Sequence, residues 1–404
     1  MTTPSSIHST DKPQRALVVI GTRPEAIKLA PVVKALKSRA DMDVRVCATG
    51  QHTDMLFPLL DWFGVKRDYT LDVMEHGQPL SHLAGKLMAG LHDVMAEFNP
   101  DIVVVQGDTT SAFVGAMAAY YSYDYFWKSG LRTVPPKIAH VEAGLRTGNN
   151  YSPYPEEVNR RLIGHMCHWS FAPTQESADA LAREGIREGV YVTGNTVIDA
   201  LFETSRIVRE SGRNPLPQIE ADKKIVLVTS HRRENYGTGL QEICEAVKTL
   251  AARYAEAGIE FVYPVHLNRN VQGPVHDMLG NLENVHLIEP QDYPDFVAMM
   301  SRSHLILTDS GGVQEEAPSL GKPVLVMREN TERPEAVAAG TAKLIGAKAG
   351  KIIAETSALL DSELLYRQMA QAKNPYGDGK AAERIANLLS GESAEKNFLG
   401  REAA

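Results

Sequence analysis

The chain has 404 residues, of which 43% are hydrophobic and 23% are charged. This is an ordinary globular composition in a chain long enough for two domains, and its net charge of −8 leaves no basic excess, so we exclude a nucleic acid as partner. The three cysteines are scattered, the N-terminal stretch is polar and lacks the apolar core of a signal peptide, and there is no run of roughly 18 apolar residues. These features predict a cytoplasmic protein that does not span a membrane.

Short apolar runs alternate with longer amphipathic stretches, which is the pattern of parallel strands joined by crossover helices. In the first half this pattern predicts strands at 16–20, 44–48, 102–105 and 137–141, with helices at 25–37 and 80–97. In the second half it predicts strands at 225–229, 261–265, 285–288, 305–308 and 324–327, with helices at 240–257 and 313–320. The two series indicate an α/β fold of two Rossmann-like, doubly wound domains.

The turn Thr193-Gly194-Asn195 is the predicted boundary between the domains. The first domain then covers residues 1–195 and the second covers residues 196–377. A turn-rich run of Asn, Pro and Gly precedes a final amphipathic helix at 380–389. We expect the C-terminal segment, about 378–404, to pack back on the first domain.

Charged residues follow the predicted strands of the first half, where ligands of open parallel sheets gather. Arg23 stands at a helix N-terminus that favours an anion. Asp108 follows the third strand, either as a helix cap or as a functional acid, and Glu142 follows the fourth strand, where capping explains it less well. Glu156 and Arg160 share a helix face, as an exposed ion pair or as part of a site.

The second half places its most specific pattern after the strand at 305–308, where Gly311 and Gly312 open a helix so that backbone N–H groups can approach a phosphate. Glu316 lies further along that helix, and Arg333 follows the next strand. His231 follows the first strand of this half, as a proton donor or as a structural histidine. Together these loops predict phosphate binding.

Metal and nicotinamide sites are not supported. No H-E-x-x-H motif or cysteine pair accompanies the histidines, which argues against zinc. A G-x-x-x-x-G-K-[ST] motif is missing, and no G-x-G-x-x-G motif follows the first strand, which argues against a P-loop and against bound NAD.

With these loops identified, the chain closely resembles the non-hydrolysing UDP-N-acetylglucosamine 2-epimerases. The longest matching stretches are Gly21–Ala30 and Thr308–Met327. Shorter matches cover nearly the whole chain in the family's order, at 50–52, 107–110, 140–147, 152–160, 193–200, 230–235, 263–268 and 332–336.

This resemblance implies the GT-B architecture, in which two Rossmann-like domains face each other across a cleft, as well as a homodimer without cofactor or metal. It also implies the reversible interconversion of UDP-N-acetylglucosamine (UDP-GlcNAc) and UDP-N-acetylmannosamine (UDP-ManNAc) for the synthesis of surface polysaccharides. In this family UDP is eliminated to give 2-acetamidoglucal and is then added back.

The resemblance further implies roles for the residues at matching positions. The catalytic group comprises Asp108, Glu142, Glu156, Arg160 and His231, and which carboxylate removes the C2 proton stays open. The UDP-binding group comprises Arg23, Lys28, Gln291, Phe296, Ser310, Gly311, Gly312, Glu316 and Arg333. A second, regulatory UDP-GlcNAc site of some relatives is matched by Gln51, His52, Arg232 and His266, but Asp54 and residues 75–78 depart from its pattern.

Three other functions compete with epimerisation. A GT-B glycosyltransferase would share the UDP site but lack the paired acids Asp108 and Glu142, and a silent nucleotide-sugar sensor would have lost one of the matched acids. A hydrolysing epimerase would release free N-acetylmannosamine. The aromatic stretch at 120–136 departs from the family, and we expect a packed surface segment there, with a lid or partner site as the alternative.

Overall fold

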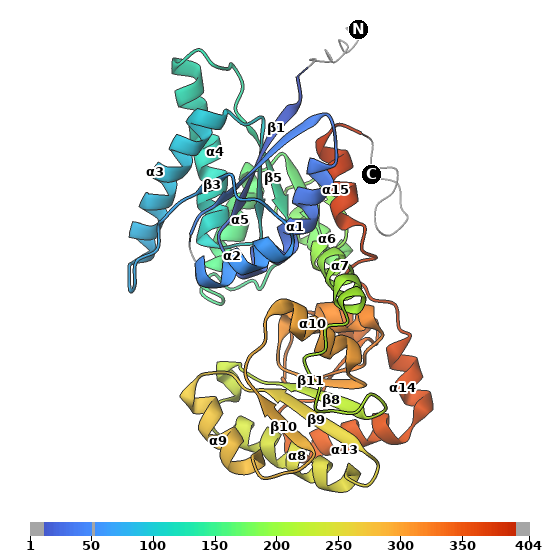
Figure 1. Ribbon diagram of the computed structural model, residues 1–404. Helices are drawn as coiled ribbons and strands as arrows, with labels where there is room; N and C mark the ends of the chain where they lie inside the picture. The colour runs from blue at the N-terminus through green and yellow to red at the C-terminus, as the bar shows by residue number, and fades with distance from the viewer. Residues whose placement is uncertain (1–11, 51–52, 393–404) are drawn as a thin grey trace. The chain divides into compact units, whose positions relative to one another are not determined.

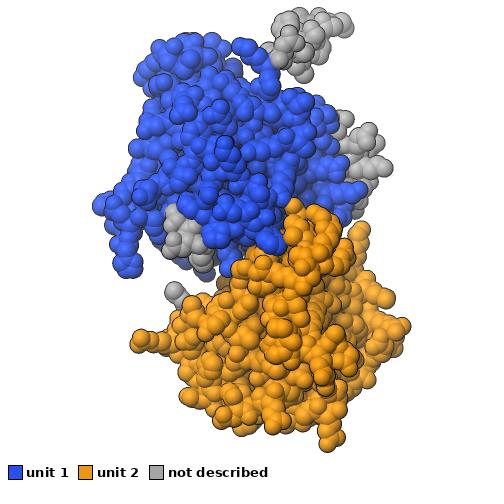
Figure 2. All heavy atoms as spheres, in the orientation of Figure 1, with its two compact units in different colours: residues 1–200, 377–404 blue, residues 201–376 orange. Residues whose placement is uncertain are grey.

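The computed structural model describes residues 12–50 and 53–392. The chain divides into two compact units (Figure 2), of which unit 1 comprises residues 1–200 and 377–404 and unit 2 comprises residues 201–376. Each unit contains one parallel β-sheet with helices between its strands. The expected α/β fold of two doubly wound sheets is therefore confirmed.

The sheet of unit 1 has the strand order β3-β2-β1-β4-β5-β6-β7, and every pairing is parallel. Strand β1, in the interior of this sheet, is formed by an apolar run that is fully buried from Ala16 to Ile20, as expected for a strand covered on both faces. The strands are β1 Gln14–Ile20, β2 Met42–Ala48, β3 Tyr69–Thr70, β4 Ile102–Gln106, β5 Lys137–Val141, β6 Trp169–Ala172 and β7 Val190–Val192.

Helices cover both faces of this sheet. On one face, α3, α4 and α5 build a common apolar core with the strands, and on the other face α1 and α15 lie side by side (Figure 1). The Asp199 carboxylate accepts hydrogen bonds from the first two backbone N–H groups of α15 at 3.3 and 2.9 Å, which anchors that helix. The helices are α1 Arg23–Lys37, α2 Thr53–Trp62, α3 Leu80–Phe98, α4 Thr110–Lys128, α5 Glu156–Met166, α6 Gln175–Arg183 and α15 Ala381–Leu389, and α7 Thr196–Ser211 begins in unit 1 and continues into unit 2.

The sheet of unit 2 has the order β10-β9-β8-β11-β12-β13, again wholly parallel. Helices α8, α9 and α13 pack on one face of it. Its strands are β8 Lys224–Thr229, β9 Ile259–Pro264, β10 Val285–Ile288, β11 Leu305–Thr308, β12 Val324–Val326 and β13 Ala342–Leu344. Its helices are α8 Thr238–Tyr254, α9 Arg269–Leu279, α10 Tyr293–Arg302, α11 Gly311–Glu316, α12 Pro334–Ala338, α13 Ala349–Asp361 and α14 Glu363–Ala370, with 3₁₀ turns η1 Arg233–Asn235 and η2 Ala317–Leu320.

Two segments differ from the sequence-based expectation. The helix predicted to end at residue 257 ends at Tyr254, because the chain turns through Gly258, which has a φ of 67°. The first part of the aromatic stretch, residues 120–128, continues α4 rather than leaving it. Tyr120, Tyr121 and Trp127 are exposed on this helix.

The order of strands reverses between β1 and β4 in unit 1 and between β8 and β11 in unit 2. In doubly wound sheets, the loops after the strands at such a switch point form the usual ligand site. The loops after these four strands begin at Gly21, Gly107, Ser230 and Asp309. These loops and the helix starts that follow them carry Arg23, Asp108, His231, Arg232 and the Ser310-Gly311-Gly312 turn, whereas Glu142 follows β5, the strand next to β4.

Candidate active site

Glu142 lies directly after β5 and is almost completely buried. Its backbone has a φ of 62°, which is uncommon for a residue with a side chain. Its carboxylate accepts hydrogen bonds from Lys28 Nζ at 2.5 Å, from Asn195 Nδ2 at 3.2 Å and from Gln106 Nε2. These partners are all donors, and one is a cation, so the surroundings suit a charged carboxylate.

Asp108 follows the neighbouring strand β4, and its loop lies beside Glu142, since a Cβ atom added to Gly107 would be 3.8 Å from Glu142 Oε2. Asp108 does not cap α4, because Thr109 accepts the hydrogen bond from the backbone N–H of Ala112. Its carboxylate instead accepts from Arg160 through Nε at 3.0 Å and through Nη2. Both donors reach the same oxygen, Oδ2, so the guanidinium holds one side of the Asp108 carboxylate.

Glu156 is the first residue of α5, and its Oε2 atom is buried without a hydrogen-bond partner among the described residues. The ion pair between Glu156 and Arg160 that the spacing suggested is replaced by contacts of Arg160 with Asp108 and Glu157. Glu157 also accepts from the backbone N–H groups of Thr147 and Gly148, so its role is structural. A buried, unpaired carboxylate oxygen calls for a ligand or a catalytic function.

The loop that follows β1 is bound to the loop that follows β4 by Glu25, which sequence reasoning did not identify. This fully buried carboxylate accepts from Gly21 N at 3.0 Å, from Thr22 Oγ1 at 2.8 Å and from Thr109 Oγ1 at 2.7 Å. Burial raises the pKa of Glu25 to about 7. The contacts bring Arg23, the first residue of α1, into the same loop cluster as Asp108.

Glycine is required close to these carboxylates at position 144. Gly144 has a φ of 94°, and an added Cβ would lie 2.1 Å from the Ser177 carbonyl oxygen. We expect Gly144→Ala to lower the free energy of unfolding by about 3 kcal/mol or more, measured by urea denaturation. Gly148→Ala is the control, because Gly148 has a similar φ of 76° but open space around it. It should cost only about 1–2 kcal/mol, and equal losses would contradict the role of the clash.

His140 is fully buried in β5, and its Nε2 atom lies 2.7 Å from the Gly107 carbonyl oxygen. Burial lowers the pKa of this imidazole from its ordinary 6.5 to about 4. The histidine therefore stays neutral in the folded protein and ties β5 to the loop that carries Asp108.

This shift predicts how acid affects stability. On acidification the unfolded chain takes up the His140 proton first, so the free energy of unfolding falls between pH 6.5 and pH 4, by roughly 3 kcal/mol in all. Above pH 6.5 this loss is absent. His140→Gln, measured by denaturation at pH 7.5 and pH 5, should reduce the difference between the two values. His76→Gln, at an exposed position, is the control, and an equal reduction there would contradict the prediction.

In unit 2, His231 follows β8, and its side chain is 42% exposed. The ring stacks on His266 with centroids 6.1 Å apart. Partial burial lowers the pKa of His231, the Asp309 carboxylate opposes this shift, and Arg232 and His266 add to it. His266 accepts from the backbone N–H of Asn268, which fixes its ring.

The two glycines after β11 leave space between two guanidinium groups. A Cβ on Gly311 would lie 3.7 Å from Arg232 Nη2 and 3.8 Å from Arg333 Nη2. Ser310 is the N-cap of α11, and its side chain makes no capping hydrogen bond. Backbone N–H groups at the start of a helix and two nearby cations are the elements of a phosphate site.

Arg333 and Glu316 are themselves fixed by neighbours. Arg333 Nε pairs with the buried Glu315 carboxylate, and Glu316 Oε2 accepts from the Tyr293 hydroxyl at 3.0 Å. Glu316 Oε1 is 3.5 Å from the position of a Cβ on Gly312, so this carboxylate reaches back to the two-glycine turn.

The remaining predicted residues are placed less centrally. Gln291 donates to the Glu289 carbonyl oxygen at 2.7 Å, and Phe296 is half-buried in α10, the helix whose Tyr293 bonds to Glu316. Gln51 and His52 lie outside the described residues. Arg232, predicted for a regulatory site, lies beside Gly311.

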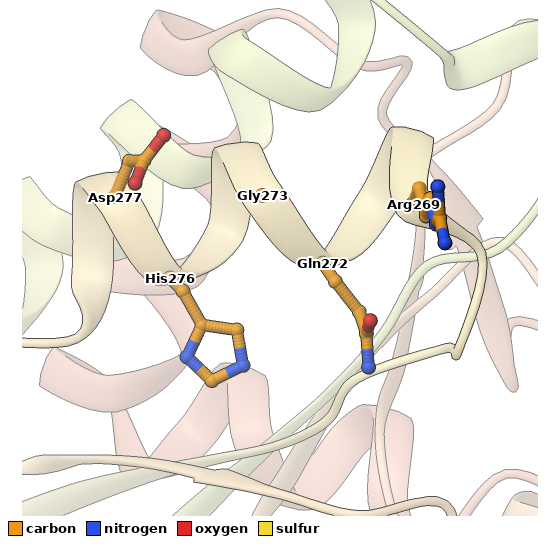
Figure 3. Close-up of a pocket in the computed structure, with 5 residues that line it drawn as sticks. All are labelled: Arg269, Gln272, Gly273, His276 and Asp277. Carbon is orange, nitrogen blue, oxygen red and sulfur yellow. The ribbon is translucent and has the colours of Figure 1, made fainter.

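A surface pocket on α9 is not part of this cluster. It is lined by Arg269, Gln272, Gly273, His276 and Asp277, all from one helix (Figure 3). The side chains of Gln272 and His276 extend to one side of the helix and that of Asp277 to the other, so these groups do not converge. Over the described part of the chain, no three His, Cys, Asp or Glu side chains gather as a metal site, and no helix has both the length and the apolar character to cross a bilayer.

Two doubly wound units, each with charged or glycine-rich loops at its switch point, define a protein of the GT-B architecture. The family model for UDP-N-acetylglucosamine 2-epimerase matches residues 34–390. This chain belongs to that family.

Individual relatives are similar over almost their full length. The UDP-N-acetylglucosamine 2-epimerase of Campylobacter jejuni is 50% identical over 386 residues, which are 93% of this chain and 97% of the relative. The crystal structure of the Neisseria meningitidis enzyme bound to UDP-GlcNAc matches with a TM-score of 0.82 and 46% identity, covering 93% of this chain and 99% of that one. A Staphylococcus aureus MnaA-UDP co-structure matches with a TM-score of 0.81 and 42% identity, covering 93% and 96%.

Proposed function

We propose that this protein catalyses the reversible epimerisation of UDP-GlcNAc to UDP-ManNAc at C2 of the sugar. One observation carries the proposal. In both sheets of a member of this family, the loops at or next to the switch point hold the groups that the reaction requires: carboxylates after β4 and β5 in unit 1, and cations beside the two-glycine turn in unit 2.

The C2 hydrogen of UDP-GlcNAc is not acidified by a carbonyl group, so simple proton abstraction is too slow. In the proposed reaction a base takes the C2 proton while the C1–O bond breaks, and UDP leaves with the bonding electron pair to give 2-acetamidoglucal. A proton then returns to the other face of C2, and UDP adds back to C1. The sum is an isomerisation that consumes no other reactant.

The two halves of the chain divide this work in the proposal. Residues 1–195, with the C-terminal helix, supply Asp108, Glu142 and Glu156 as proton-transferring groups, with Arg160 orienting Asp108.

Residues 196–377 bind UDP. The Gly311-Gly312 turn, Arg333 and His231 bind the diphosphate, and Glu316 binds the ribose. Negative charge that develops on the departing diphosphate is stabilised by these donors and cations.

We further propose that the enzyme is a cytoplasmic homodimer. The exposed Tyr120, Tyr121 and Trp127 on α4 form an apolar surface suited to contact with a second copy. Light scattering of the wild type and of a Trp127→Glu variant tests this, and a monomeric wild type would refute it.

Deuterium incorporation tests the reaction itself. The purified protein is incubated with UDP-GlcNAc in heavy water, and C2 of the sugar is followed by NMR. Deuterium at C2 of UDP-ManNAc is the expected result. Release of free N-acetylmannosamine would identify a hydrolysing enzyme instead, and no exchange at C2 would exclude the elimination reaction.

A further inference from the structure

Asp309 is a buried carboxylate to which the loop after β8 is bound. It lies directly after β11 and is fully inaccessible to solvent. Its oxygens accept from Ser230 Oγ, from the backbone N–H groups of His231 and Arg232, and from Asn235 Nδ2, all at 3.0–3.1 Å. One carboxylate thus fixes the loop of His231 relative to the two-glycine turn on the neighbouring strand.

The same carboxylate also faces the histidine ring. Asp309 Oδ1 is 3.3 Å from His231 Nδ1, so the ring nitrogen that is left for a ligand is Nε2. A carboxylate beside Nδ1 keeps the proton on that nitrogen and stabilises the imidazolium form, in which Nε2 is a donor. The backbone contacts restrict the position of the ring, and the ring contact restricts its tautomer.

We propose that Asp309 is the positioning residue for His231: it holds the proton on Nδ1 and directs Nε2 to the diphosphate, so that the imidazolium form of the ring donates Nε2–H as UDP departs. The effect of Asp309 on UDP departure rests on the proposed epimerase function, whereas the contact between Asp309 and His231 does not. Asp309 itself touches no substrate, because it is buried beneath the loop that it organises.

The charged and titratable groups that act on His231 are Asp309, Arg232 and His266, and only the carboxylate favours the protonated ring. Asp309→Asn removes that charge at nearly constant size. We expect kcat to fall about tenfold, and the basic limb of the pH–kcat profile, where His231 loses its proton, to move to lower pH. Ser230→Ala is the matched control, because it removes a hydrogen bond to Asp309 without changing the charge. It should leave the basic limb in place, and a limb that does not move in Asp309→Asn would overturn the proposal.

A measurement on the wild type covers the case in which Asp309→Asn does not fold. Nitrogen-15 NMR of the histidine-labelled protein, with His231→Gln for assignment, reports the tautomer of His231 without substrate. Protonated Nδ1 in the neutral ring is expected, and protonated Nε2 alone would overturn the proposal. This readout does not depend on turnover, so the two possible failures can be told apart. If the proposed function is wrong, the wild type shows no exchange at C2. If the inference is wrong, the NMR spectrum shows the other tautomer of His231.

Discussion

Glu142→Gln should reduce kcat for epimerisation by roughly 10²–10⁴-fold, the usual effect of removing a proton-transfer group. The replacement has nearly the same size and the same backbone requirement at φ 62°, so it removes the charge and leaves the loop in place. Formation of UDP-ManNAc and deuterium exchange at C2 are the measurements. Both should fall together if Glu142 takes part in proton transfer.

A control separates this effect from loss of an ion pair, because Glu142→Gln also deprives Lys28 of its anionic partner. Glu184 pairs with Arg146 at 2.7 Å in the same unit but away from the switch point. Glu184→Gln should retain kcat within a few-fold. The assignment fails if the two variants lose activity equally, or if Glu142→Gln retains exchange at C2. Thermal unfolding of both variants shows whether the fold is retained.

The acids at strand ends could be predicted because their signal is local. Asp108 and Glu142 each follow a short apolar strand, and parallel strands bring their carboxyl ends to one edge of the sheet. The structure places the loops of these two residues in contact, as the position of Gly107 shows. Burial on both faces of the strands produces the apolar runs from which the prediction started.

Glu25 and Asp309 were missed because their importance depends on distant partners. Glu25 resembles an ordinary acid in the first turn of a helix, but it bonds to Thr109, 84 residues away. Asp309 bonds to the backbone of His231, 78 residues away. A signal for Asp309 did exist, since it directly follows a buried strand as Glu142 does. No local pattern states which donors a buried carboxylate will collect.

The partner of Arg160 also could not be predicted from local sequence. Helical spacing pairs it with Glu156, four residues earlier, whereas the structure pairs it with Asp108, 52 residues away, and with Glu157. Charge-assisted contacts of Arg160 with two carboxylates, Asp108 and Glu157, are stronger than a single ion pair with Glu156 along the helix. The tertiary partner therefore takes the guanidinium, and Oε2 of Glu156 is buried without a partner in the part of the chain that the structure describes.

Gly311→Ala should weaken UDP binding by about 100-fold while leaving the fold intact. A Cβ at this position meets only the ends of the Arg232 and Arg333 side chains, at ordinary contact distances of 3.7 and 3.8 Å. The backbone there has no positive φ, so alanine is tolerated in the free protein. The added methyl group would occupy the space between two guanidinium groups and the start of α11, where the diphosphate is proposed to bind. A loss of 100-fold corresponds to about 3 kcal/mol of binding free energy.

Calorimetric titration with UDP measures the affinity, and thermal unfolding without ligand measures the fold. Gly350→Ala is the matched control, because Gly350 also lies in the first turn of a helix, α13, and has open space around it. It should bind UDP with unchanged affinity, since its methyl group is added away from the two-glycine turn. If Gly311→Ala binds UDP as tightly as the control does, the diphosphate does not approach the backbone at Gly311, and the UDP site must lie elsewhere in unit 2. If Gly311→Ala unfolds before it can be titrated, the glycine serves packing rather than binding, which its ordinary contact distances argue against.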